Sequence, residues 1–221
     1  AVYQLSALHT LEHETQVKRF IGECIGDTPV EIRIGRTGHY AVIRIDDLIV
    51  NHKPDFEKYK MMVLALLRAA KEESVTLKKT KLSLLLYLAD MRNYYETKES
   101  MSGMTYRKQS YGPVSETFHR LIDEMERDGT LAITQVLRDD YHMYEIKESR
   151  GSTRMKLMHL ATKEQQRLHE LCQAWGATPT AELQQFIMAG RPMSETTEGS
   201  DVAYTLLCSE EPHLVSSRTL P

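Results

Sequence analysis

The sequence has few of the features that mark secreted, membrane-spanning or metal-bound proteins. It contains three cysteines among 221 residues, Cys24, Cys172 and Cys208, which lie far apart and in no metal-binding spacing. We therefore expect reduced thiols rather than disulfides or a zinc site. No apolar run approaches the roughly 20 residues that a membrane helix needs. No basic segment followed by an apolar stretch opens the sequence, so we expect no signal peptide and a soluble, cytoplasmic chain.

The sequence motifs of common enzyme and nucleotide-binding classes are also missing. There is no Gly-x-Ser-x-Gly, no phosphate-binding Gly-Lys-Ser/Thr and no Gly-x-Gly-x-x-Gly. His9 and His13 lie four residues apart and would share one face of a helix. Two ligands do not make a zinc site, however, and no cysteine lies near them. We therefore predict a protein that is not an enzyme and that holds no metal or other cofactor.

The chain also lacks the basic surplus that is typical of nucleic-acid-binding proteins. It has 28 Lys and Arg against 31 Asp and Glu, a formal net charge of -3. Its 41% hydrophobic and 27% charged residues are those of an ordinary globular protein. Two local basic groups remain, and the second could contact nucleic acid, an acidic patch on a partner, or only solvent. These groups are Lys78, Lys79 and Lys81, and then Lys147, Arg150, Arg154 and Lys156.

Residues 1–55 have the pattern of a small module of their own. Apolar residues recur at helical spacing over 17–24. The period changes to two over 30–45, where two alternating segments flank a Gly-Arg-Thr-Gly turn, and this predicts a β-hairpin. A third short strand is expected at 48–50.

The chain from residue 56 onward predicts three helices followed by a second β-hairpin. Apolar stripes mark helices at about 56–70, 80–95 and 115–129, the last of them beginning at an N-capping serine. The intervening residues 100–113 are expected to form a loop. Two β-rich segments within 131–146 then predict paired strands. This order of elements is that of a winged helix.

Two more helices and a polar tail complete the pattern. One helix is expected from an N-cap at Thr162 to Gly176, and the next from Thr178 to Gly190. Residues 192–221 are polar and are expected to wrap over the surface or to fray.

We therefore predict an α+β, mainly α protein. Its expected centre is a winged-helix-like helical domain with a β-hairpin wing, preceded by a small N-terminal module that contains a β-hairpin. The predicted divisions are 1–55 for the module, 56–190 for the domain and 191–221 for the tail.

Several motifs in register carry a resemblance to a known family. They are K-L-S-L-L-L-Y-L-A-D at 81–90, M-T-Y at 104–106, Y-G-P-V at 111–114, D-G at 128–129, a helix opening at 160–164 and A-E-L at 181–183. Together they resemble the Panacea (SocA-like) antitoxin domain over roughly residues 56–190. The sequence departs from the family where a His and a Trp are often found, since it has Arg191, Pro192 and Met193 there.

The resemblance implies an antitoxin of a bacterial or phage toxin–antitoxin pair, without catalytic residues. Such a protein neutralises its cognate toxin, usually encoded by the adjacent gene, by direct protein contact. One member of the family acts instead as an adaptor that delivers its toxin to a protease. A winged-helix DNA-binding repressor is the competing hypothesis, and nucleic acid is not the expected partner.

The Y-G-P-V turn is interpreted as architecture. Gly112 permits a positive φ and Pro113 fixes its own, so together they set the direction of the chain that follows. Asp90, at the end of an apolar helix, is expected to accept a hydrogen bond from a local backbone group or an arginine. The residues assigned to this structural motif are Leu82, Leu85, Leu86, Tyr87, Asp90, Gly112, Pro113 and Val114.

The helix expected at 115–129 is predicted to face another protein. It has five acidic against two basic residues, and such a surplus repels phosphates instead of releasing counterions. The alternative is that its outer face is simply solvated. Tyr111 is predicted to be exposed beside it, and aromatic side chains are enriched at binding hot spots. The predicted partner-binding residues are Tyr111, Glu116, His119, Arg120, Asp123 and Glu124.

Overall fold

The chain folds into helices and small antiparallel sheets, which confirms the α+β prediction. The computed structural model describes residues 31–35, 38–42, 53–97, 99–138 and 141–209. In the first two of these parts, β1 (Glu31–Gly35) pairs antiparallel with β2 (Gly38–Val42), and Gly35 lies opposite Gly38. The hairpin predicted over 30–45 is therefore confirmed. The helix predicted at 17–24 and the strand at 48–50 lie outside the described residues.

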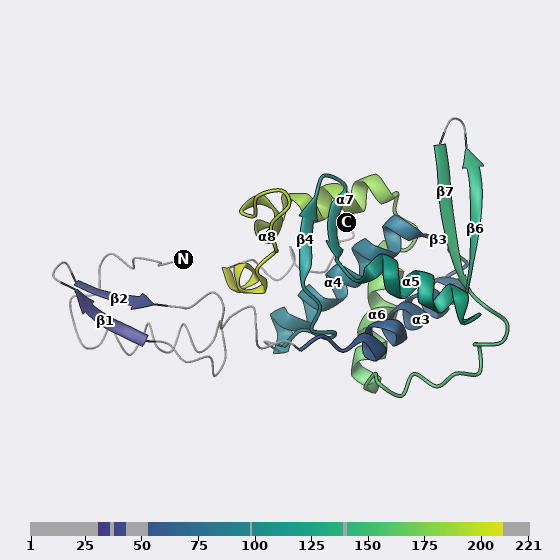
Figure 1. Ribbon diagram of the computed structural model, residues 1–221, viewed down its shortest axis with the longest axis horizontal. Helices are drawn as coiled ribbons and strands as arrows, with labels where there is room; N and C mark the ends of the chain where they lie inside the picture. Colours follow the sequence, from purple (N-terminus) through teal and green to yellow (C-terminus); the bar gives the residue numbers. More distant parts are fainter. Residues whose placement is uncertain (1–30, 36–37, 43–52, 98, 139–140, 210–221) are drawn as a thin grey trace.

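Three long helices build the core. In α3 (Phe56–Glu72), the N-capping Asp55 accepts a hydrogen bond from the Lys58 backbone at 2.8 Å. Next comes α4 (Lys79–Thr97), which is buried on most of its circumference, as its leucine-rich sequence predicts. α6 (Thr162–Trp175) packs against both and buries Leu168, Leu171 and Trp175 (Figure 1).

A three-stranded antiparallel sheet lies at one end of these helices. Its order is β3-β7-β6, from β3 (Leu77–Lys78), β6 (Leu131–Arg138) and β7 (Tyr141–Glu148). The hairpin predicted within 131–146 is thus confirmed, with Ile133 opposite Ile146 near its base. Beyond that base, the β6–β7 hairpin stands away from the helices, and β6 is its outer strand (Figure 1).

The stretch between α4 and the next helix corrects two expectations. Residues 100–113 are not all loop, because β4 (Tyr106–Gln109) pairs with β5 (Gly112–Ser115). Ser115 ends this ladder opposite Tyr106 and does not cap a helix. α5 (Phe118–Arg127) begins three residues later, with Thr117 at the N-cap position.

The C-terminal part packs more closely than expected. α7 (Thr180–Ala189) and the short α8 (Arg191–Ser194) are followed by the 3-10 helix η1 (Tyr204–Ser209). Met193, Val202 and Leu207 are buried, so residues 192–207 do not simply fray. Residues 199–202 run along β4, and the Val202 backbone N–H donates to the carbonyl of Tyr106 at 2.8 Å. The predicted divisions at residues 55 and 190 stay predictions.

Candidate partner-binding surface

Asp90 is the centre of a buried hydrogen-bond network, which we call the Asp90 hub. Its fully buried carboxylate accepts from the Ser102 backbone N–H and the Tyr106 hydroxyl, each at 2.7 Å. The Ser100 hydroxyl donates at 2.8 Å, and the Ser102 hydroxyl donates as well. Burial raises the pKa of the Asp90 carboxyl, and these hydrogen bonds oppose that rise. The sequence predicts a local backbone group or an arginine as the partner of Asp90; its backbone donor is instead Ser102, 12 residues along the chain.

The hub joins segments that are far apart in the sequence. Tyr106 belongs to β4, and its ring meets that of Tyr87 from α4 edge-on at 5.2 Å between centroids. Tyr204 from η1 donates to the carbonyl of Met104 at 2.7 Å and lies 3.2 Å from the Ser100 hydroxyl. The network thereby fixes the β4–β5 hairpin and the C-terminal segment against α4.

All the residues assigned to the structural motif are buried. Gly112 has a φ of +118°, which side chains rarely adopt, so this position favours glycine; a Cβ there would also lie 2.6 Å from Leu84 Cδ2, and the end of that side chain would have to shift. The buried motif residues are Leu82, Leu85, Leu86, Tyr87, Asp90, Gly112, Pro113 and Val114.

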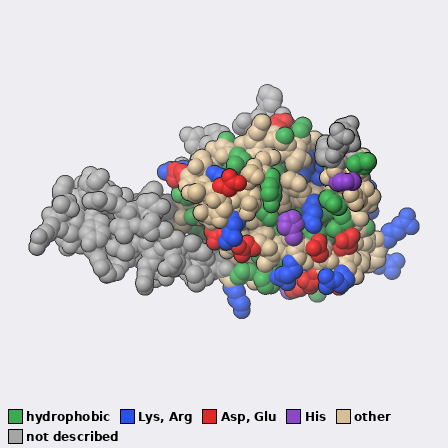
Figure 2. All heavy atoms as spheres, turned by 45° about the horizontal axis from the view of Figure 1, so that its top comes forward, with side chains coloured by type: hydrophobic (Ala, Val, Ile, Leu, Met, Phe, Trp, Pro, Cys, Tyr) green, Lys and Arg blue, Asp and Glu red, His purple; other side chains and the backbone are tan. Residues whose placement is uncertain are grey.

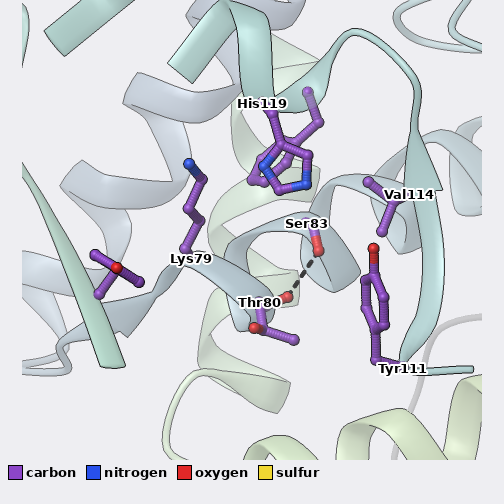
Figure 3. A pocket seen from close by; sticks show the side chains of 8 residues that line it. Lys79, Thr80, Ser83, Tyr111, Val114 and His119 are labelled. Atoms are coloured by element: carbon purple, nitrogen blue, oxygen red, sulfur yellow. Dashed lines mark hydrogen bonds between the residues drawn. The ribbon is translucent and has the colours of Figure 1, made fainter. Parts of the chain in front are cut away.

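Beside the β4–β5 hairpin lies a pocket of about 400 Å³, which we call the aromatic pocket (Figure 3). The start of α4, the hairpin, the start of α5 and the strand β7 all contribute to it. The lining residues are Lys79, Thr80, Ser83, Tyr111, Val114, Phe118, His119 and Tyr144.

The aromatic pocket brings together two of the predicted partner-binding residues, Tyr111 and His119. Tyr111 and Tyr144 are 48% and 44% exposed, so both rings are accessible from solvent. Burial and the neighbouring Lys79 lower the pKa of His119, which favours the neutral imidazole. The pocket therefore offers aromatic and aliphatic walls with a few polar groups, a composition suited to an apolar side chain of a partner.

The three acidic side chains predicted to bind a partner, on or just before α5, form ion pairs with bases from other elements. Glu116 forms an ion pair with Arg107 of β4 at 2.6 Å. Asp123 lies 3.4 Å from the ammonium of Lys79. Figure 2 shows a face of the molecule on which basic and acidic side chains lie interspersed, without a large area of one sign.

The other two predicted residues on α5 are also held within the chain. Glu124 pairs with Lys60 of α3 at 2.6 Å, and this contact lowers the pKa of the Glu124 carboxyl. The Arg120 guanidinium lies over the ring of Phe56 at 5.3 Å from its centroid. The net charge of the α5 sequence is therefore not the charge of the surface that α5 helps to form.

Comparison with known families adds an observation independent of this geometry. Residues 82–191 match the family model described as "Antitoxin SocA-like, Panacea domain". The chain contains a Panacea domain. The match runs from α4 to the start of α8, and so it includes Asp90 with its donors Ser100, Ser102 and Tyr106, the β4–β5 and β6–β7 hairpins, and α5. No curated protein and no solved structure matches the chain.

The family match begins at residue 82, next to Lys81, which the sequence placed in a basic cluster. Its side chain is buried, and the ammonium donates to the carbonyls of Gly176 and Thr178 at the end of α6. A cation at this position satisfies helix-terminal carbonyls and favours the C-terminal end of the helix dipole. Lys81 therefore links two helices of the Panacea domain and is not available to a phosphate.

The surface contains residues that the sequence did not assign to partner binding. Tyr144, Phe118 and Lys79 line the aromatic pocket with Tyr111 and His119.

Across the parts of the chain that the structure describes, no group of three His, Cys, Asp or Glu side chains could hold a metal ion. Over the same residues, no helix is long and apolar enough to cross a membrane.

Proposed function

We propose that this chain is the antitoxin of a bacterial or phage toxin–antitoxin pair, and that it neutralises its toxin by direct contact. The observation that carries the proposal is the match of residues 82–191 to an antitoxin domain family. The toxin is expected from the adjacent gene, and the pair is expected in the cytoplasm. In this proposal the chain binds and occludes its partner and catalyses no reaction.

We infer that the aromatic pocket and the adjoining face of α5 receive the toxin. Exposed tyrosines around a concave site are typical of binding hot spots, because they contribute large contact area at low entropic cost. Tyr111 lies in the turn of the β4–β5 hairpin, which the Asp90 hub holds against α4, and Tyr144 lies on β7 across the pocket. The ion-paired Glu116, Asp123 and Glu124 then form a charged rim, which favours the correct partner more than it adds affinity.

Co-expression with the neighbouring reading frame tests this proposal. Growth should stop when the neighbour is expressed alone and recover when this chain is expressed with it. Continued arrest, with both proteins present in soluble form, would overturn the proposal. Recovery accompanied by loss of the neighbour's protein would instead indicate a proteolytic adaptor.

A DNA-binding repressor remains the second candidate because of the order of the elements. We propose that α3, β3, α4, α5, β6 and β7 form a winged helix with α5 in the recognition position, supported by the sheet order β3-β7-β6. Arg150, Arg154 and Lys156 are exposed next to this hairpin. Binding to the chain's own promoter that weakens steeply with salt would favour the repressor. The antitoxin proposal predicts no such binding by the isolated chain at physiological salt.

A further inference from the structure

β6 forms one edge of its sheet among the described residues. β6 is the last strand of its sheet, so alternate backbone N–H and C=O groups of residues 131–138 point away from β7. Within the described parts of the chain, no other strand pairs with this edge. Proteins usually protect such edges with lysine, proline, a bulge or a covering segment.

The sequence of β6 carries none of these protective residues. Residues 131–137, Leu-Ala-Ile-Thr-Gln-Val-Leu, contain no charge and no proline. The segment is also nearly symmetric about its centre: it begins and ends with a leucine, and Thr134 is its middle residue. A second copy of the same strand can therefore lie against it without opposing like charges.

The geometry of an antiparallel ladder restricts how two identical strands pair. Only alternate residues direct their backbone groups toward one neighbour, so a symmetric pair must have its two-fold axis at a residue. An axis at Thr134 uses the complete uncharged segment and leaves Arg138 outside it. Thr134 then faces its own copy, Ala132 faces Val136, and Leu131 faces Leu137 of the second copy.

This pairing also covers exposed apolar surface. Leu137 is 65% exposed near the tip of the hairpin, whereas Leu131 is 3% exposed at its base. In the symmetric arrangement, Leu137 of each copy packs beside Leu131 of the other. Cross-strand pairs of this kind are the contacts that stabilise a sheet.

We propose that two copies of this chain associate through β6, antiparallel about a two-fold axis at Thr134, so that two three-stranded sheets become one of six strands. The association needs no toxin and involves residues outside the aromatic pocket. Its test is therefore independent of the antitoxin proposal.

The first experiment measures the mass of the full chain by light scattering over a range of concentrations. The expected mass is twice the 25.4 kDa of one chain, falling toward one chain on dilution. Thr134→Glu should raise the dimer dissociation constant about tenfold or more, because it places two further carboxylates between the Glu145 side chains that lie opposite residue 134. His142→Glu, an equally charged change on β7, should leave the dimer intact.

Mixing two variants checks that the effect comes from charge and not from misfolding. Thr134→Glu combined with Thr134→Lys should restore a dimer that contains one copy of each. A wild-type chain that stays monomeric at every concentration would overturn the proposal. So would a Thr134→Glu chain whose dimer mass is unchanged.

Single cysteines test the position of the axis. With Cys24 and Cys208 replaced by Ser, Thr134→Cys should form a disulfide-linked dimer under mild oxidation. Cys172 can stay, because burial raises the pKa of its thiol to about 11. Gln135→Cys is the matched control, since its two copies would be diagonal neighbours, about 7–8 Å apart and too far for a disulfide. Faster cross-linking at 135 than at 134 would overturn this pairing.

Discussion

The Asp90 hub and the β6–β7 hairpin differ in whether their polar groups have hydrogen-bond partners within the chain. At the hub, a buried carboxylate has four hydrogen-bond donors from three residues. On the hairpin, the outer backbone groups of β6 have no neighbouring strand among the described residues, and Leu137 and Tyr144 are exposed. The polar groups of the hub hydrogen-bond one another and stabilise the fold. The outer backbone groups of the hairpin can still hydrogen-bond to a partner. Changes at the hub should therefore affect folding, and changes at the hairpin should affect binding.

Replacing Asp90 should give the largest loss of stability. Asp90→Ala leaves the Ser102 N–H and the Tyr106 hydroxyl buried without an acceptor, which we expect to cost about 3–5 kcal/mol. Urea unfolding followed by circular dichroism measures this cost. Asp201→Ala is the control, because Asp201 forms an exposed ion pair with Arg107 at 3.2 Å and should cost less than about 1 kcal/mol. Similar costs for the two variants would contradict the distinction between hub and surface.

Changes at the aromatic pocket should show the opposite behaviour. This prediction assumes that the toxin binds there. Tyr111→Ser combined with Tyr144→Ser should weaken toxin binding by about 2 kcal/mol or more, roughly thirtyfold, while the unfolding free energy changes little. Titration calorimetry with the toxin and urea unfolding measure the two quantities. Met158→Ser, at an 81% exposed methionine outside the pocket, should change neither. Full binding by the double variant would place the interface elsewhere.

Gly112 follows the pocket residue Tyr111 on the β4–β5 hairpin, the hairpin that the hub holds against α4. Gly112→Ala should destabilise the chain by about 1–3 kcal/mol, since alanine is strained at a φ of +118° and its Cβ meets Leu84. Gly151→Ala is a control in open space, where no atom lies within 4 Å of a new Cβ. Thermal unfolding of the two variants compares them directly. Equal melting temperatures would contradict a requirement for glycine at 112.

The sequence predicted the helical core better than the binding surface. A leucine on nearly every side of α4 predicts a central helix, because this pattern arises only when a helix is surrounded. The ion pairs of α5 could not be predicted in the same way, since Lys60 and Lys79 are separated by 64 and 44 residues from the carboxylates they meet. Tyr144 alternates with its neighbours like any strand residue, and only the direction of the hairpin places it in the pocket.

The β4–β5 hairpin shows why local turn motifs can be misinterpreted. Glycine and proline at 112–113 predict a turn, and the serine that follows is a good N-cap. In the structure, residues 199–202 hydrogen-bond to β4, and β4 in turn pairs with β5 through Ser115. This tertiary contact comes from a segment about 90 residues away, so it could not be predicted from the local sequence pattern.

The smallest expected effect concerns the pH dependence of the hub. Because burial raises the pKa of Asp90 above its ordinary value of 3.8, the folded chain binds this proton more tightly than the unfolded chain does. The contribution of the protonated carboxyl to stability is complete below that value and is lost as the pH rises through the folded pKa. Asp90→Asn cannot titrate, so the stability of the wild type relative to this variant should fall as the pH rises, by at most about 1.4 kcal/mol per pH unit. Urea unfolding of both chains at several pH values measures this difference in stability. The contributions of the other titrating groups are the same in both chains and cancel. A relative stability that rises with pH would show that the donors from Ser100, Ser102 and Tyr106 outweigh burial and hold the carboxylate ionised.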